Sequence, residues 1–494
     1  MSTSEAGAAA PPDPRRWLAL GILLIANFMN LIDVTIVNVA LPSMRDNLGA
    51  SNSQIEWVVA AYVLAFALGL LPFGRLGDVV GRTRMFLIGV VAFTLASALC
   101  GMAGSIEMLI GARVLQGLGG AMMTPQVLAI ATVTFPPEER GQAFSLFGLS
   151  AGLAAVCGPI LGGILIDAQL FGLDWQPIFL VNIPIGIAAI VAGWFLIPRL
   201  PGHPDLSNDY AGIGLFGAGI VAVVFPIIEG RALGWPAWSF AMMVAGLGLL
   251  VGFFFWQKHR ARIGRPQLLN YDLLANRDYM FGALVVTIFA SGIPGMFMVI
   301  SLLLQAGFGF SPLQSGLTNT PFSVGVLIAS FIAGRFGSHY LRSRVAAAGA
   351  MLVIGIGWLH LVIAGTGSSI DPWSFLTPLL IAGIGLGTGF SSLFQLVLRN
   401  VPPRDAGAGS GALQAFQQVG GALGVALVGQ IFFSQLAGNL AVGNGPEAAF
   451  GGAAALSLWY QVVAFGLVLA LAFVFKGSSR LPSKDKARPV VAEV

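Results

Sequence analysis

Apolar stretches of about 20 residues, the length a helix needs to cross a bilayer, recur along almost the whole chain, and this repetition limits its fold more than any other feature. The composition agrees, because 56% of the 494 residues are hydrophobic and only 9% are charged. A soluble domain has a very different balance. The sequence therefore predicts an all-α polytopic membrane protein.

Fourteen membrane spans are predicted, with no soluble domain between them. The first sixteen residues are small, polar and proline-rich, and the apolar run that follows them is too long for a signal peptide. That run is expected to stay as the first span. The approximate spans are 17–40, 55–74, 85–104, 108–134, 141–167, 176–197, 210–228, 239–256, 279–303, 314–334, 345–364, 374–398, 407–433 and 453–475.

The basic residues predict the orientation. If the N-terminus is cytoplasmic, 22 of the 25 lysines and arginines fall in inner loops or tails. Only Arg45 and Arg231 fall outside, and Arg113 lies within a span. This asymmetry predicts that both termini are cytoplasmic and that the number of spans is even. The basic charge is thus a topology signal, and no nucleic-acid partner is predicted.

Several function classes lack their residues. No lysine follows a glycine, so the chain has no phosphate-binding loop of the G-x-x-x-x-G-K-[ST] type. The four histidines form no ligand-spaced cluster, and Cys100 and Cys157 both lie inside predicted spans. No intramembrane nucleophile or carboxylate pair is evident. An ATP-driven pump or an enzyme is therefore not expected, and neither is a bound metal or a cofactor.

The chain contains an internal repeat. The segment "GRLGDVVGRTR" from Gly74 matches "GRFGSHYLRSR" from Gly334 at an offset of 260, and "FPPEERGQA" from Phe135 parallels "VPPRDAGAG" from Val401. An offset of this size leaves room for an extra pair of spans between two six-span copies, a symmetry known in rocking transporters. The predicted divisions are a cytoplasmic tail 1–16, a six-helix bundle 17–197, a linker 198–278 with extra spans at about 210–228 and 239–256, a second bundle 279–475 and a cytoplasmic tail 476–494.

Four motifs now carry a family resemblance. "LIDVTIVNVALP", "GRLGDVVGRTR", "RVLQGLGGA" and "GPILGGIL" occur in order on the first, second to third, fourth and fifth spans. They are similar to signature motifs of the major facilitator superfamily, specifically of its drug:proton antiporters with fourteen transmembrane helices. The resemblance implies two six-helix bundles plus two inserted helices, and it covers nearly the whole chain.

Asp33 and Arg113 are the charged residues of chief interest. With a rise of about 1.5 Å per residue, Asp33 lies about 10 Å from the outer end of its span and Arg113 about 9 Å from the outer end of its own. An ionised group at such a depth faces a partner or a watery cavity. Burial and a nearby guanidinium shift a carboxyl pKa in opposite directions, so a change in their separation would move a proton. The resemblance implies proton coupling here, and a fixed ion pair that merely orders two helices is the alternative.

Two further motifs are expected to serve the conformational cycle. The inner loop after the second span carries a carboxylate among arginines, and its resemblance to the family's loop implies a cytoplasmic gate formed by Gly74, Asp78, Arg82 and Arg84. The repeat has Ser338 in place of Asp78. Small residues let helices approach closely and proline kinks a helix. The fifth span combines both features and resembles the family's antiporter motif, which favours export, at Gly152, Gly158, Pro159, Gly162 and Gly163.

The substrate cavity is expected to be lined by aromatic, flexible and amide side chains, which suit lipophilic guests of varied shape. The second half has no intramembrane carboxylate, so a neutral or monocationic substrate is expected. The predicted cavity residues are Trp57, Tyr62, Gln116, Phe289, Met296, Phe297, Gln395, Gln414, Phe416 and Gln417.

The resemblance and the residues together predict a proton-coupled antiporter for multidrug efflux, driven by the proton gradient and located in the cell's inner (plasma) membrane. The same machine dedicated to one natural product or metabolite is the alternative. Whether export also needs a periplasmic adaptor stays open, and a sensor or channel of this fold is a competing class.

Overall fold

The computed structural model describes residues 14–202, 209–230, 232–336, 340–367, 369–399, 401 and 406–475. Most of the predicted first tail and all of the predicted tail 476–494 lie outside these ranges. Each of the fourteen predicted spans overlaps a helix, and the described residues contain no strand. Helices prevail because hydrocarbon offers backbone N–H and C=O groups no partner, and a helix satisfies them internally.

The helices of the first half are α1 (Arg16–Leu48), α2 (Asn52–Val80), α3 (Arg82–Gly101), α4 (Ile106–Thr134), α5 (Pro137–Asp167), the short η1 (Leu170–Gly172), α6 (Pro177–Leu180) and α7 (Asn182–Leu196). They are followed by α8 (Tyr210–Glu229), α9 (Ala237–Arg262) and the short α10 (Tyr271–Ala275). The second half has α11 (Arg277–Ser291), α12 (Pro294–Leu302), η2 (Leu303–Gly307), α13 (Pro312–Phe336), α14 (Leu341–Ala364), η3 (Pro372–Phe375), α15 (Leu376–Leu398), α16 (Ala406–Ala441) and α17 (Pro446–Ala472).

Twelve helical segments of the described chain are long and apolar enough to cross a membrane. They do not include α5 or α13, so the predicted count of fourteen is not confirmed. The protein is an all-helical, polytopic membrane protein, as predicted. Local sequence sets several helix ends. For example, the Ser51 side chain accepts a hydrogen bond from the Gln54 backbone N–H, and the Ser51 backbone N–H donates to Gln54 Oε1, which forms a capping box at the start of α2.

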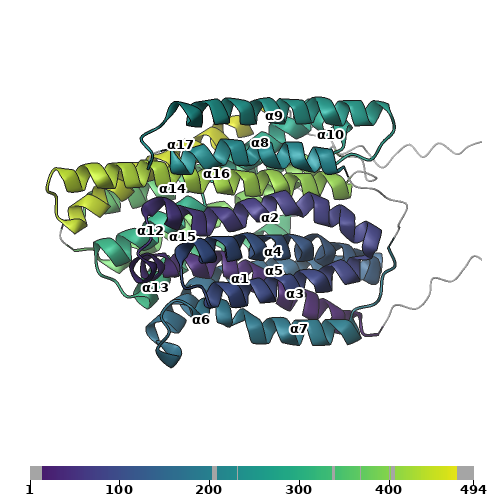
Figure 1. Ribbon diagram of the computed structural model, residues 1–494, viewed down its shortest axis with the longest axis horizontal. Helices are drawn as coiled ribbons and strands as arrows, with labels where there is room; N and C mark the ends of the chain where they lie inside the picture. The colour runs from purple at the N-terminus through teal and green to yellow at the C-terminus, as the bar shows by residue number, and fades with distance from the viewer. Residues whose placement is uncertain are drawn as a thin grey trace, which may run out of the picture.

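The helices lie roughly parallel, and their packing follows two groups (Figure 1). Helices α1 to α7 pack mainly on one another, as α1 on α5 and α4 on α2 and α3. Helices α11 to α17 do the same, as α14 on α15 and α17. Two main contacts join the groups, namely α5 with α13 and α2 with α16. The division of the chain into six, two and six spans stays a prediction.

Helices α8 and α9 pack on each other at one side of the molecule (Figure 1). Of these two helices, α8 is the one that packs on both groups, through α2 and α16. Asp209, at the start of α8, ties the pair together, because it accepts hydrogen bonds from Trp256 Nε1 at 2.9 Å and from Gln257 Nε2 at 2.8 Å. On the other end, Trp57 Nε1 donates to Glu229 at 2.7 Å and joins α2 to α8.

Candidate functional site

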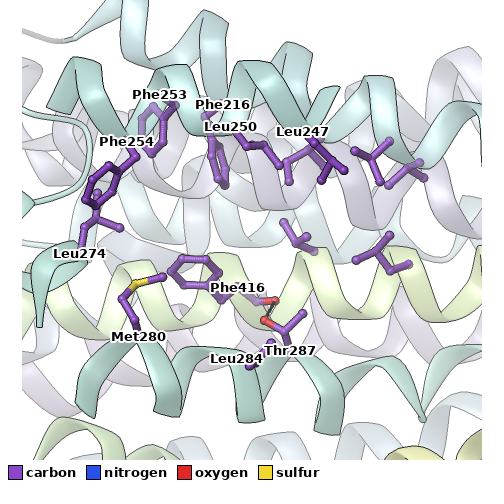
Figure 2. A pocket seen from close by; sticks show the side chains of 15 residues that line it. Phe216, Leu247, Leu250, Phe253, Phe254, Leu274, Met280, Leu284, Thr287 and Phe416 are labelled. Atoms are coloured by element: carbon purple, nitrogen blue, oxygen red, sulfur yellow. Dashed lines mark hydrogen bonds between the residues drawn. The ribbon is translucent and has the colours of Figure 1, made fainter. Parts of the chain in front are cut away.

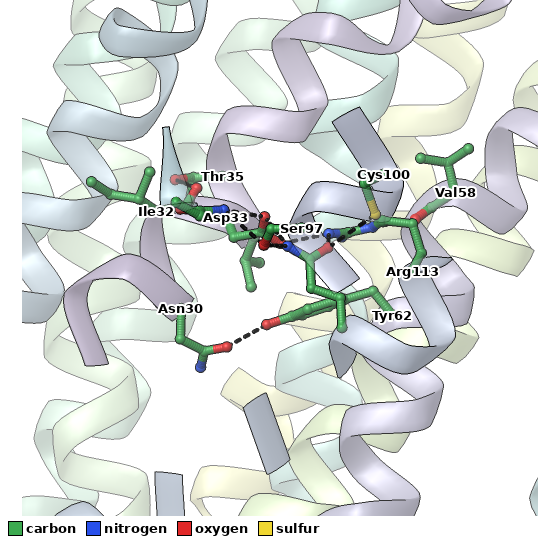
Figure 3. Close-up of polar contacts among 12 residues, drawn as sticks. Asn30, Ile32, Asp33, Thr35, Val58, Tyr62, Ser97, Cys100 and Arg113 are labelled. Carbon is green, nitrogen blue, oxygen red and sulfur yellow. Dashed lines mark hydrogen bonds and ion pairs between the residues drawn. The ribbon is translucent and has the colours of Figure 1, made fainter. Parts of the chain in front are cut away.

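Asp33 and Arg113 form a buried ion pair between α1 and α4. Arg113 Nη1 donates to Asp33 Oδ2 at 2.5 Å, and the side chains are 2% and 0% exposed, respectively. Arg113 Nε also donates to the carbonyl oxygen of Val58 on α2 at 3.1 Å. The equal depth predicted from the sequence thus corresponds to direct contact between the two charges (Figure 3).

Three uncharged side chains complete the surroundings of the pair. Gln116, one helical turn after Arg113, accepts from its Nη1 at 2.6 Å and donates to Asp33 Oδ1 at 2.7 Å. Asn182 on α7 donates to the same carboxylate oxygen at 3.3 Å. Ser97 Oγ on α3 accepts from both amides. Such a network removes part of the cost of burying the charges.

Glycines on α4 make this close assembly possible. A Cβ atom at Gly119 would lie 2.6 Å from the backbone nitrogen of Phe93 on α3, and one at Gly117 would collide with the Tyr62 carbonyl oxygen on α2. Both glycines belong to the "RVLQGLGGA" motif. Because only glycine fits, α4 approaches α2 and α3 closely enough for Arg113 to reach Val58 and Asp33.

Tyr62 links the ion pair to a cavity. The Arg113 guanidinium lies over the Tyr62 ring, with Cζ 4.2 Å from the ring centroid, a cation–π arrangement. The Tyr62 hydroxyl donates to Asn30 Oδ1 at 2.5 Å (Figure 3), and Asn30 Nδ2 donates to Thr124 Oγ1 at 3.3 Å. Tyr62, Asn30 and Thr124 all line a cavity between the two groups of helices.

A cavity of about 240 Å³, here termed the central cavity, lies between α1, α2 and α4 on one side and α15 and α16 on the other. None of its lining residues is charged. Aromatic rings and amides provide most of its surface, a mixture that suits aromatic, partly polar guests. The lining residues are Asn27, Asn30, Leu31, Val34, Tyr62, Phe66, Thr124, Phe390, Phe394, Gln414, Gln417 and Gln418.

The ten predicted cavity residues occupy several different places. Tyr62, Gln414 and Gln417 line the central cavity. Gln116 lies in the ion-pair network, Trp57 bonds to Glu229, and Phe416 lines a second, lateral groove. Phe289 and Phe297 pack edge-on against other phenylalanines, Met296 is buried in the core, and Gln395 is exposed. The predicted residues that line neither the central cavity nor the lateral groove stay predictions, and no contact with a cavity supports them.

The sequence analysis did not identify Asn27 and Asn30. They occur three residues apart on α1, and Asn30 is three residues before Asp33. Residues with this spacing share a helix face, so a polar stripe within an apolar span is the signal that could have revealed them. Glu56 is a second omission. It is a carboxylate one turn into α2, it is 1% exposed, and it packs against Gly429 of α16.

The predicted gate residues lie where α2 ends and α3 begins. Arg82 Nη2 is 3.0 Å from Asp78 Oδ1, and Arg82 Nη1 donates to the Ala129 carbonyl oxygen of α4 at 3.3 Å. Gly81 between them has φ of 102°, which favours glycine. Gly74 lies near Pro125, and Arg84 is exposed. The described contacts join α2, α3 and α4 within the first half.

The predicted antiporter-motif residues on α5 touch both halves. A Cβ at Gly158 would meet Thr35 of α1, and one at Gly162 would lie 2.8 Å from Ile36. On the other face, Gly163 approaches the Leu313 backbone of α13 and Gly152 approaches Leu327. The Pro159 carbonyl oxygen lies against Gly316 of α13. Helix α5 is therefore a close-packed contact between the halves.

The chain is similar to a known protein family and to several named transport and resistance proteins. The model of the family described as "Major Facilitator Superfamily" matches residues 23–425. A protein described as "Probable actinorhodin transporter" from Streptomyces coelicolor is 42% identical over 432 residues, which cover 87% of this chain and 74% of the relative. The "Putative multidrug resistance protein MdtD" of Cronobacter sakazakii is 31% identical over 491 residues, 97% of this chain and 98% of the relative.

A solved structure supports the fold. The crystal structure of a bacterial homolog to the human lysosomal transporter Spinster, in an inward-facing and occupied conformation, matches with a TM-score of 0.66 at 16% identity. The match covers 94% of this chain and 97% of that one. The family match and the relatives indicate a transporter and agree with the helical membrane fold. The chain is thus a multi-pass membrane transporter that belongs to the Major Facilitator Superfamily.

Proposed function

We propose that this protein is a proton-coupled antiporter that exports lipophilic small molecules by alternating access. One observation carries the proposal: the buried Asp33–Arg113 pair contacts Tyr62, and Tyr62 also lines the central cavity between the two groups of helices. A proton site and a substrate site then share one side chain. Substrate bound in the central cavity can therefore change the surroundings of the Asp33–Arg113 pair through Tyr62.

Proton transfer follows from the environment of the Asp33 carboxylate. In this structure the carboxylate contacts a guanidinium and two amides and is sealed from solvent. The free energy of protonating a carboxyl depends on nearby charge, hydrogen bonds and desolvation. A rearrangement that separates α1 from α4 changes all three, so Asp33 binds a proton in one conformation and releases it in the other.

The contacts between the halves support an inward-facing state. Gln305 Nε2 donates to the Val39 carbonyl oxygen at 2.8 Å, and Ser311 Oγ donates to Asp167 Oδ2 at 3.0 Å. Both bonds lie toward the predicted outer side, where α1 and α5 end. The central cavity lies on the inner side of these bonds, since its residues on α1, from Asn27 to Val34, come before Val39 on a helix that runs from the predicted inner side to the outer side. Outward opening would break the α5–α13 contact and expose Glu56.

The substrate class rests on the cavity wall and on the relatives. A wall of aromatic rings and amides without a charged side chain suits neutral or monocationic lipophilic compounds. One relative is described as a "Probable actinorhodin transporter" and another as a "Putative multidrug resistance protein MdtD". These names support efflux, and they leave both a broad substrate range and a single dedicated compound as candidates.

The proposal includes the finer organisation inferred from the sequence. Helices α5 and α13 would also span the membrane, which gives fourteen spans in a six, two, six order with both ends cytoplasmic. The Asp78–Arg82 pair would act as the cytoplasmic gate, because a carboxylate held against an arginine makes bonds that exist in only one gate position.

Purified full-length protein in liposomes with an internal pH dye tests the proposal. Under an imposed pH gradient, addition of a transported dye should move protons in the opposite direction to the dye. The Asp33→Asn variant in matched liposomes should show neither proton movement nor uphill transport. Dye accumulation against its gradient without any proton movement would contradict the proposal. Transport of several unrelated dyes would support multidrug efflux, and transport of one compound alone would support the dedicated exporter.

A further inference from the structure

A second void lies outside the proposed transport pathway. A groove of about 390 Å³, here termed the lateral groove, separates α8, α9 and α10 from α11 and α16 (Figure 2). Its volume is in the range of small-molecule sites, about 300–1,000 Å³. The lining residues are Phe216, Ile220, Val223, Val224, Leu247, Leu250, Phe253, Phe254, Leu274, Met280, Leu284, Thr287, Phe416, Val419 and Leu423.

The wall of the lateral groove offers a ligand no free hydrogen-bond donor. Thr287 is its one polar side chain, and the Thr287 hydroxyl already donates to the Ala283 carbonyl oxygen at 2.9 Å. A polar drug would find only the Thr287 hydroxyl oxygen as a partner in the wall. A hydrocarbon chain needs no such partner, and a lipid chain that moves from the bilayer into the groove exchanges one apolar surrounding for another.

The groove spans about two thirds of the depth of one leaflet, whose hydrocarbon layer is about 15 Å thick. Its lining runs from Met280 to Thr287 on α11 and from Phe254 to Leu247 on α9, which is about 10 Å along each helix. Both stretches begin close to the predicted cytoplasmic ends of their helices. Figure 2 shows Phe254, Leu274 and Met280 together at one end of the groove. The groove therefore extends from the inner interface towards the bilayer midplane.

Basic residues lie next to that inner end along the chain. Lys258 is one turn beyond Phe254 on α9 and Arg262 is two turns beyond it, while Arg277 is three residues before Met280 on α11. With Arg265 there are four cations against the carboxylates of Asp272 and Asp278, so this rim has a net charge of +2 (4 − 2). Apart from the half-buried Lys258, these charged groups are exposed. Arg260 does not belong to the rim, because it binds Asp209 and the Pro266 carbonyl oxygen.

We infer that the lateral groove binds an anionic phospholipid of the cytoplasmic leaflet, with an acyl chain in the groove and the headgroup at the basic rim. The apolar wall matches the chain, and the rim matches the headgroup, since basic residues at the inner surface attract anionic lipids. The lipid would fill the space that α8 and α9 leave beside α11 and α16. It would thereby hold the inserted pair against the second half.

The site touches the transport machinery through α16. Phe416 and Val419 face the lateral groove, whereas Gln414, Gln417 and Gln418 face the central cavity. One helix thus forms a wall of both voids. The inference does not rest on the proposed transport function, because lipid binding is measured without transport.

Lipid retained by the full-length protein provides the test. The protein is purified in mild detergent, and bound phospholipid is identified by native mass spectrometry and by chromatography of the extract. We expect one phosphatidylglycerol-type lipid per chain. Leu284→Trp places a larger side chain in the groove from an exposed position, so it should displace the acyl chain and largely abolish lipid retention. Leu361→Trp, on an exposed part of α14 that does not line the groove, is the matched control and should retain the lipid.

A second set of variants tests the rim. Neutralising Lys258, Arg262 and Arg277 together to glutamine should abolish the preference for phosphatidylglycerol over phosphatidylethanolamine. Neutralising Lys484, Lys486 and Arg488 of the tail should leave that preference intact. Equal lipid retention by the wild type and Leu284→Trp would overturn the inference. So would retention of a small molecule other than a phospholipid that Leu284→Trp removes, or a wild-type protein that shows no headgroup preference.

Discussion

The guanidinium of Arg113 donates to the carboxylate of Asp33 at 2.5 Å in a place that solvent does not reach. Eighty residues of chain separate the two side chains, and they come from different helices. Burying two charges costs several kcal/mol for each ion, and close pairing offsets this only when further hydrogen bonds are present. The amides of Gln116 and Asn182 provide such bonds.

Asp33→Asn should insert and fold but lose uphill transport. The variant leaves the Arg113 charge buried without its carboxylate, which costs about 3–5 kcal/mol when one partner of a buried pair is removed. The Gln116 and Val58 oxygens still accept from Arg113 and limit that loss. Thermal unfolding in detergent and dye accumulation in liposomes check both parts. Asp46→Asn, at an exposed carboxylate, is the control. Normal accumulation against a gradient by Asp33→Asn would refute the role of Asp33.

Tyr62→Phe should weaken coupling more than it weakens the fold. The variant keeps the ring under the Arg113 guanidinium and removes only the hydroxyl bond to Asn30, a change of about 0.5–1.5 kcal/mol. Proton release per transported dye molecule should fall, while the melting temperature changes little. Tyr460→Phe is the control, because it also removes a hydroxyl hydrogen bond, the one from Tyr460 to Ser291 at 2.9 Å. That bond belongs to the second half of the chain, so the number of protons released per dye molecule should not change. Unchanged coupling in Tyr62→Phe would remove Tyr62 from the mechanism.

Gly163→Ala should disfavour the closed contact between α5 and α13. The new Cβ would lie 2.8 Å from the Leu313 backbone nitrogen and 3.0 Å from the Pro312 carbonyl oxygen, so α13 must move away. Such overpacking costs about 1–3 kcal/mol. Spin labels on the outer ends of the two helices should report a longer distance, and transport should slow. Gly357→Ala has open space around its Cβ and should change neither measurement. A label distance unchanged by Gly163→Ala would contradict this prediction.

The Arg16–Glu139 pair predicts a pH-dependent contribution to stability. Both nitrogens of the fork, Nε and Nη2, donate to the carboxylate at 2.8 Å, and these bonds lower the pKa of Glu139 below its usual value. Because the folded-state pKa is the lower one, the stabilisation is present above the unfolded value of about 4.3 and disappears as the pH falls through the folded value. As the pH is lowered from about 6 to about 3, the melting temperature should fall less steeply for Glu139→Gln than for the wild type. Parallel curves for the two proteins would contradict the prediction.

The spans could be predicted from the sequence because each depends on local composition. An apolar run must form a helix in lipid wherever its neighbours lie, so all fourteen predicted runs overlap helices. The depth of a charge within a span is likewise a count along one helix. For that reason Asp33 and Arg113 could be placed at one level before their contact was known.

The central cavity could not be predicted with the same success. Helix packing decides which face of each helix meets another, and a single apolar span carries little pattern that marks this face. Phe416 and Gln417 illustrate the difficulty, because these neighbours on α16 line different voids. Gln116, a predicted cavity residue, bonds to Asp33 and Arg113 and is not among the residues that line the central cavity.

The sequence by itself determined the membrane-spanning helices, the predicted orientation and the presence of one acid and one base at equal depth, because hydrophobicity, loop charge and helical rise act locally along the chain. Only the tertiary structure decided that Tyr62 joins this pair to a cavity, that Glu56 packs at the contact between the halves and that α8 and α9 enclose an apolar groove. Those relations depend on distances between helices, which close packing of side chains from remote segments sets.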